Sequence, residues 1–223
     1  MQKKETKRFK KPWPTKAAMD QVYEMKLWGD DASEFYSGTG SHHPEIIAPY
    51  IKELTTFLSS FKTPLTVCDL GCGDFNVGKE LVPYANTYVA VDIVTKLIDY
   101  NKERFKDEKV VFQCLDIAVD DLPSGDCALV RQVLQHLSNT EIQGILTKLA
   151  AFKYVVLTEH LPEGQFIPNK EIISGQGTRL RKQSGVHVES APFSFKYLTK
   201  KELLSLAEPA GKGILVTTCY QLF

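Results

Sequence analysis

One short stretch, residues 65–74 (LTVCDLGCGD), constrains the fold of this chain more than any other. Its first half is apolar, contains β-branched residues and follows Pro64, which predicts a buried strand. Its second half carries Gly71 and Gly73, which let the backbone turn sharply and approach a ligand without a Cβ in the way. A helix can begin again at residue 77, so the stretch predicts the strand–turn–helix start of an α/β unit.

A second apolar run, residues 88–92, ends in a carboxylate. Asp92 follows the glycines by about 20 residues, the spacing at which a strand-end acid in a βαβ unit meets a ribose hydroxyl. A dinucleotide site would need G-x-G-x-x-G, but Asn76 stands at the third position. Asp69 would also repel a phosphate, by roughly 3 kcal/mol at about 5 Å and an effective dielectric of about 20. The same carboxylate favours a ligand with ammonium and sulfonium charges, such as S-adenosylmethionine.

Residues 67–73 (VCDLGCG) resemble the first motif of the class I S-adenosylmethionine-dependent methyltransferases. Residues 89–93 and 112–117 are similar to the second and third strands of that family, and the likeness continues in order and spacing to about residue 160. The chain is thus identified as a small, bacterial-type member of this superfamily. The resemblance implies a Rossmann-like α/β fold with a seven-stranded, mostly parallel sheet, helices on both faces and an N-terminal helical cap.

The rest of the chain is predicted to form one compact domain. We expect a basic flexible tail at 1–13, the helical cap at 14–60 and the core at 61–223, with a long insertion at 161–195. Hydrophobic periodicity and capping signals predict helices and strands in alternation. The expected helices span 14–27, 44–58, 77–84, 94–105 and 138–151; the expected strands span 65–70, 88–92, 109–115, 126–130, 153–158 and 213–223. A second capping box, Thr199 with Glu202, predicts a helix to about residue 206, and 185–189 is a candidate strand inside the insertion.

The resemblance implies S-adenosyl-L-methionine as cofactor and S-adenosyl-L-homocysteine as its product. Ligands of a parallel sheet bind beyond the carboxyl ends of its strands, where most of the expected cofactor contacts fall. These contacts are Tyr36, Asp69, Gly71, Cys72, Gly73, Asp92, Ile93, Asp116, Ile117 and Arg131. By resemblance, Asp116 faces the adenine amino group and Ile117 the ring. Tyr36 could equally pack within a capping loop, and Arg131 could equally bind an acidic acceptor or pair with an acidic neighbour.

The candidates for catalysis are His136 and, as a second choice, Glu159. His136 follows the fourth predicted strand, and histidine titrates near neutrality, but a structural histidine at a helix start is an equal interpretation. Methyl transfer from a sulfonium is an in-line displacement, so positioning can supply much of the rate. A base is needed only if the acceptor must lose a proton. The expected acceptor pocket contains His42, Gln132, His160 and Arg179; solvated side chains are the alternative for His42 and Arg179.

Composition limits the partners that we expect. Lys and Arg total 27 and Asp and Glu also total 27, so the overall charge implies neither a nucleic acid nor a membrane. The five cysteines form no C-x-x-C, which indicates reduced thiols in the cytoplasm. No metal site is expected at Cys68 and Cys72, because the strand and the turn point them in different directions. No apolar run reaches the roughly 18 residues that span a bilayer, and the basic N-terminus lacks the apolar core of a signal peptide. A monomer or weak dimer is expected.

We predict methyl transfer to a small molecule. The alternatives are an RNA or protein methyltransferase that uses the basic tail, a catalytically silent S-adenosylmethionine-binding protein, and an NAD oxidoreductase. The chain lacks the Asn/Asp-Pro-Pro-aromatic motif of nucleobase aminomethylases after the fourth predicted strand. Cytosine C5 enzymes need an exposed nucleophilic cysteine in the motifs that follow the fourth or fifth strand. The chain lacks one there, since Cys127 lies within a predicted strand.

Overall fold

One seven-stranded sheet runs through the described part of the chain, residues 13–209, 211 and 213–223 of a computed structural model. Its strand order is β3-β2-β1-β4-β5-β7-β6. Strands β1 to β5 are parallel, whereas β7 is antiparallel to both β5 and β6. The strands are β1 Thr66–Leu70, β2 Thr87–Asp92, β3 Val110–Cys114, β4 Cys127–Arg131, β5 Tyr154–Leu161, β6 Thr199–Ala207 and β7 Ile214–Gln221. The predicted Rossmann-like fold is confirmed.

The central strands are apolar on both faces because helices cover the sheet on each side. One face packs against α5, Asn139–Leu149, which begins at the predicted capping box of Ser138 and Glu141. The other face packs against α2 (Pro44–Ser59), α3 (Gly78–Leu81) and part of α4 (Thr95–Arg104). The segment predicted as one helix over 77–84 consists of α3 and a following 3-10 turn, Val82–Tyr84.

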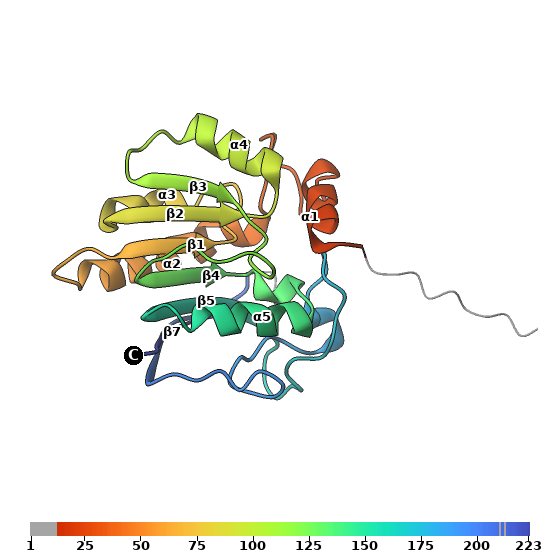
Figure 1. The fold of residues 1–223 in the computed structure, drawn as a ribbon. Coiled ribbons are helices and arrows are strands. Elements are labelled where there is room, and N and C mark those ends of the chain that lie inside the picture. The colour runs from red at the N-terminus through yellow and green to blue at the C-terminus, as the bar shows by residue number, and fades with distance from the viewer. Residues whose placement is uncertain (1–12, 210, 212) are drawn as a thin grey trace, which may run out of the picture.

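Helix α1, Thr15–Glu24, lies beyond the carboxyl ends of the parallel strands (Figure 1). Met19, Val22 and Tyr23 on its buried face pack with Val94 and Leu97 at the start of α4. Of the segment predicted as a cap, α1 thus covers the strand ends while α2 packs against the sheet. The predicted basic tail lies outside the described residues, apart from Trp13.

The predicted helix after residue 199 is wrong, because this segment is the edge strand β6. It pairs with β7 from Thr199 to Ala207, with one irregularity between Glu202 and Leu204. The capping box is a local signal, and pairing with a neighbouring strand overrides it. Exposed lysines along β6 are typical of an edge strand, which they protect from further pairing.

The segment between β5 and β6 is a long irregular connection, as expected, with one 3-10 turn, η4, at Arg179–Lys182. The candidate strand at 185–189 is wrong: these residues form an irregular segment in which Val186 and Val188 are nevertheless buried. The side chain of Asn169 organises the segment, since its amide nitrogen donates to the carbonyls of His187 and Ala191, both at 2.9 Å.

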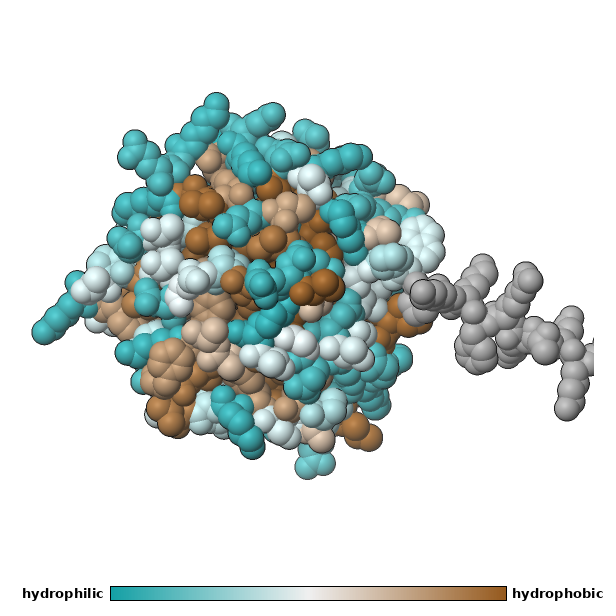
Figure 2. Space-filling view, in the orientation of Figure 1, coloured by the Kyte–Doolittle hydropathy of each residue, from teal (hydrophilic) through white to brown (hydrophobic). Residues whose placement is uncertain are grey.

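No helix among the described residues is both long enough and apolar enough to cross a membrane. On the face shown in Figure 2, hydrophilic side chains are interspersed with smaller hydrophobic groups and dominate over α4 at the top.

Candidate functional site

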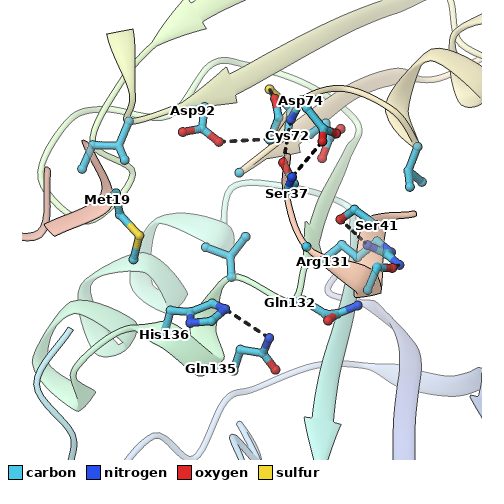
Figure 3. Close-up of a pocket in the computed structure, with 18 of the residues that line it drawn as sticks. Met19, Ser37, Ser41, Cys72, Asp74, Asp92, Arg131, Gln132, Gln135 and His136 are labelled. Atoms are coloured by element: carbon cyan, nitrogen blue, oxygen red, sulfur yellow. Dashed lines mark hydrogen bonds between the residues drawn. The ribbon is translucent and has the colours of Figure 1, made fainter. Parts of the chain in front are cut away.

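A cavity of about 320 Å³ opens at the carboxyl ends of the parallel strands. Its walls come from those ends, α1, the 3-10 turns η1 (Thr39–Ser41) and η3 (Leu134–His136), and the connection between β5 and β6 (Figure 3). Eleven of the sequence-predicted site residues line it: Asp69, Gly71, Cys72, Gly73, Asp92, Ile93, Asp116, Ile117, Arg131, Gln132 and His136. Five others do not: Tyr36, His42, Glu159, His160 and Arg179.

The glycine turn after β1 is held by bonds to the end of β2. Gly71 and Gly73 have φ angles of 93° and 56°, which favour glycine. The amides of Gly71 and Cys72 donate to the carbonyl of Val91 at 2.8 and 2.9 Å, and the amide of Gly73 donates to Asp92 Oδ2 at 3.0 Å. Successive amides that cradle a phosphate must point at the ligand. Here all three already have acceptors inside the protein.

Two buried carboxylates stand on either side of this turn. The Asp92 Oδ1 atom accepts a bond from the amide of Val94 at 3.1 Å. Burial raises the pKa of Asp92, and its backbone hydrogen bonds act in the opposite direction. Asp69 Oδ2 accepts from the Tyr88 hydroxyl at 2.9 Å. Burial raises the pKa of Asp69 to about 6, against the effects of that hydroxyl and of Arg131. This rim of the cavity is therefore suited to hydroxyl groups and cations.

Arg131, at the end of β4, is the one Lys or Arg among the described lining residues. Its guanidinium lies 4.8 Å from the ring centroid of Tyr50 and donates to Ser41 Oγ at 3.2 Å and to the carbonyl of Gly40. Its Nε is buried and has no hydrogen-bond partner among the described residues. An anionic group of a ligand could accept from this nitrogen.

Asp74 connects the glycine turn to the loop before η1. Its Oδ2 accepts from the amide of Ser37 at 2.8 Å and from His42 Nε2 at 2.6 Å, while its own amide donates to Ser37 Oγ at 2.8 Å. The ring of Tyr36 packs on that of His42, with centroids 4.5 Å apart. Tyr36 and His42 therefore lie behind Asp74 and support the wall rather than forming it.

His136 reaches the cavity from η3. Its Nδ1 lies 3.3 Å from the carbonyl of Gly177 and its Nε2 lies 3.3 Å from Gln135 Nε2 (Figure 3). The neutral ring satisfies both contacts when Nδ1 carries the proton, donates to Gly177 and leaves Nε2 to accept from Gln135. Burial lowers the pKa of His136 to about 4. The ring packs against Trp28, with centroids 5.0 Å apart.

The three remaining candidates lie away from the cavity. Glu159 is buried, and burial raises its pKa to about 8 against the effects of Arg179 and of the backbone amides of Gln135 and Leu134. His160, the next residue of β5, is also outside the lining, and burial lowers its pKa. Arg179 is 1% exposed, so it is not a solvated side chain. It donates to carbonyls of η3 and of the residue after it, including those of Leu134 at 3.2 Å and Leu137 at 2.7 Å.

Several lining residues were not singled out from the sequence. They are Met19, Tyr23, Trp28, Ser37, Asp74, Gln135, Gln176 and Thr178. Asp74 and Gln135 directly adjoin the recognised motifs, and that adjacency was the available signal. The others come from α1, the loop after it and the β5–β6 connection, and only the fold brings these segments together. Nowhere in 13–209, 211 and 213–223 do three or more His, Cys, Asp or Glu residues form a group that could hold a metal ion.

Residues 67–152 match the family model described as a methyltransferase domain. This range begins in β1 and ends after α5, so it includes the glycine turn, Asp92, Asp116 and His136. No curated protein matches the chain significantly in sequence.

Solved methyltransferase structures share the fold at low sequence identity. The N-methyltransferase NodS from Bradyrhizobium japonicum, in complex with S-adenosyl-L-homocysteine, is 14% identical with a TM-score of 0.64, covering 92% of this chain and 98% of NodS. The 1,6-didemethyltoxoflavin-N1-methyltransferase of Burkholderia thailandensis is 15% identical with a TM-score of 0.57, covering 93% of this chain and 87% of that enzyme. The magnesium protoporphyrin IX methyltransferase of Synechocystis is 13% identical with a TM-score of 0.56, covering 95% of this chain and 99% of that enzyme.

Three observations point to the same kind of domain. They are the strand order, the glycine turn bonded to the strand-end Asp92, and the family match over 67–152. Residues 67–152 are thus similar to a methyltransferase domain, and the chain has the fold of solved methyltransferases.

Proposed function

We propose that this chain transfers a methyl group from S-adenosylmethionine to a small-molecule acceptor in the cavity at the strand ends. The observation that supports S-adenosylmethionine as the methyl donor is the hydrogen bonding of the glycine turn. Its amides already donate to Val91 and Asp92, so a pyrophosphate would find no free N–H group there. The carboxylates of Asp69 and Asp92 would also repel it. A donor with a sulfonium and an ammonium group meets favourable charges at the same place.

The residues present fit such a donor. Asp92 would accept from the ribose hydroxyls with the lone pairs that the backbone leaves free. Asp116 and Ile117 would face the adenine, and the unpartnered Nε of Arg131 would donate to the carboxylate of the methionine part. Gly71 has no room for a Cβ, which would collide with Val133. Bound there, the donor supplies an electrophilic methyl group on a good leaving sulfur.

The chain's own residues would position the acceptor. A lone pair of the acceptor forms the new bond to the methyl carbon as the carbon–sulfur bond breaks, and the bonding electrons remain on sulfur. In-line displacement of this kind gains mainly from alignment. His136 is a weak base because of its low pKa, so we assign it a role in holding the acceptor as a neutral group. Glu159 lies outside the lining and would support η3 without touching the acceptor.

A small acceptor is supported by the enclosure of the cavity. Helix α1 closes it on one side and the β5–β6 connection on another, so the lining comes from segments far apart in the sequence. The similar structures include enzymes named for toxoflavin and porphyrin substrates, which are small molecules.

Calorimetry with S-adenosylhomocysteine and with NADH tests the donor site. We expect binding of the first only, and a loss of about 10-fold or more in Asp92→Ala, because one charged hydrogen bond contributes about 1.5–3 kcal/mol. The matched control is Asp99→Ala, on the exposed side of α4. Binding of NADH without S-adenosylhomocysteine would refute the assignment.

The acceptor class is tested with methyl-labelled donor and a cell extract divided into small-molecule, RNA and protein fractions. Label is expected among the small molecules. Label confined to RNA or to protein would overturn the acceptor class, and donor binding with no label in any fraction would mean a catalytically silent protein.

A further inference from the structure

The lining of the cavity divides into a charged rim and an uncharged wall. The charged rim consists of the lining residues at and near the strand ends: Asp69, Asp74, Asp92, Asp116 and Arg131. The uncharged wall comes from α1, the loop after it, η3 and the β5–β6 connection. It includes Met19, Trp28, Val133, His136, Gln176 and Thr178. None of these six carries a formal charge apart from His136, which titrates.

The structure keeps His136 uncharged. Its Nδ1 donates to the carbonyl of Gly177 and its Nε2 accepts from Gln135, both at 3.3 Å, so both ring nitrogens are occupied in the neutral form. Burial acts in the same direction by lowering the pKa of the ring.

The uncharged wall presents flat groups to the cavity. The rings of Trp28 and His136, which both line it, pack against each other with centroids 5.0 Å apart and an interplanar angle of 43°. The thioether of Met19, which is 8% exposed, lies across the cavity from Gln132 (Figure 3). Aromatic, thioether and amide surfaces favour contact with a planar ligand. An ionic group buried against them would have no counter-charge, which is costly.

We infer that the methyl acceptor is an uncharged, planar small molecule, aromatic or heteroaromatic, whose ring lies against Trp28 and His136. This inference rests on the proposed function, because the donor must occupy the charged rim. The acceptor then offers a neutral nitrogen or oxygen atom as the nucleophile. Its lone pair bonds to the methyl carbon, the carbon–sulfur pair goes to sulfur, and a displaced proton, where the nucleophile carries one, passes to water.

The test divides the small molecules of an extract before the reaction. Ion exchange at pH 7 separates an uncharged, an anionic and a cationic pool, and each is incubated with the full chain and methyl-labelled S-adenosylmethionine. We expect the uncharged pool to receive at least ten times the label of either charged pool. Label mainly in a charged pool would overturn the inference while leaving the proposed function intact. Label in none of the three, with S-adenosylhomocysteine still bound, would overturn both.

A variant that adds charge to the wall gives an independent check. Thr178→Asp places a carboxylate in the lining, and Thr63→Asp makes the same change at an exposed position before β1. Thr178→Asp should reduce labelling of the uncharged pool at least 10-fold while the Kd for S-adenosylhomocysteine changes less than 2-fold. Thr63→Asp should change neither. Unchanged labelling in Thr178→Asp would contradict the assignment of the wall to the acceptor.

Discussion

Replacing Arg179 by Met should destabilise the protein through η3, far along the chain from the substitution. The guanidinium is 1% exposed and lies between the β5–β6 connection and η3. It makes five hydrogen bonds, to the carbonyls of Lys170 (3.0 Å), Leu134 (3.2 Å), Gln135 (3.4 Å) and Leu137 (2.7 Å) and to Asn139 Oδ1 (2.8 Å). The amide of Gly175 donates to the remaining carbonyl of this stretch, that of His136, at 3.0 Å.

The magnitude follows from what the substitution leaves behind. Met fills much of the same space but donates nothing, so buried carbonyls lose their partner. Each unsatisfied buried group costs about 1–3 kcal/mol, but such costs within one network do not add fully. With four carbonyls and the Asn139 amide oxygen losing a charged donor together, a combined cost of about 3–5 kcal/mol is expected. We expect a loss in this range, a large part of the roughly 5–15 kcal/mol that holds a domain together.

Urea denaturation measures the loss directly, and thermal unfolding should show a fall in Tm of roughly 10 °C. Arg181→Met is the matched control, because Arg181 is an exposed residue of the same 3-10 turn η4. Hydrogen exchange should also accelerate in residues 134–137 of the variant. If the free energies of unfolding of the two variants agree within about 0.5 kcal/mol, η3 does not depend on the guanidinium and the reasoning fails.

Three further predictions concern other residues of the site and its support. The pKa of Glu159 is raised from 4.5 to about 8, so the folded state binds the proton more tightly, and the free energy of unfolding should fall by a few kcal/mol as the pH rises from about 4.5 through about 8. Denaturation at several pH values should show this slope flattened in Glu159→Gln; an unchanged slope would exclude Glu159 as its source. Gly71→Ala should weaken S-adenosylhomocysteine binding at least 10-fold in calorimetry, because the new Cβ meets Val133 at a φ of 93°, whereas Gly177→Ala, which meets nothing within 4 Å, should bind normally. Equal affinities would show that the turn tolerates a side chain. By NMR, the His136 ring should stay neutral and protonated at Nδ1 down to about pH 5, and a titration midpoint near 6.5 would contradict its burial.

Much of the fold could be predicted because local patterns encode it. The apolar runs of β1, β2 and β4 are continuous since both faces of a parallel sheet are covered, and the capping box of α5 lies within four consecutive residues. The capping box at Thr199 shows the limit of such signals. It predicts a helix, but the neighbouring strand β7 offers a full ladder of partners and the segment forms β6 instead.

The site likewise has a part that local sequence patterns predict and a part that they do not. The glycine turn, Asp92 and Asp116 could be placed on one edge of the sheet from the sequence, because the carboxyl ends of parallel strands must meet there. The sequence could not show that Arg179 would be buried against carbonyls some forty residues earlier, or that Trp28 would pack on His136. Those contacts join segments that carry no periodic signal. They depend on where the folded sheet brings irregular segments together, so only the tertiary structure decides which side chains could face the acceptor.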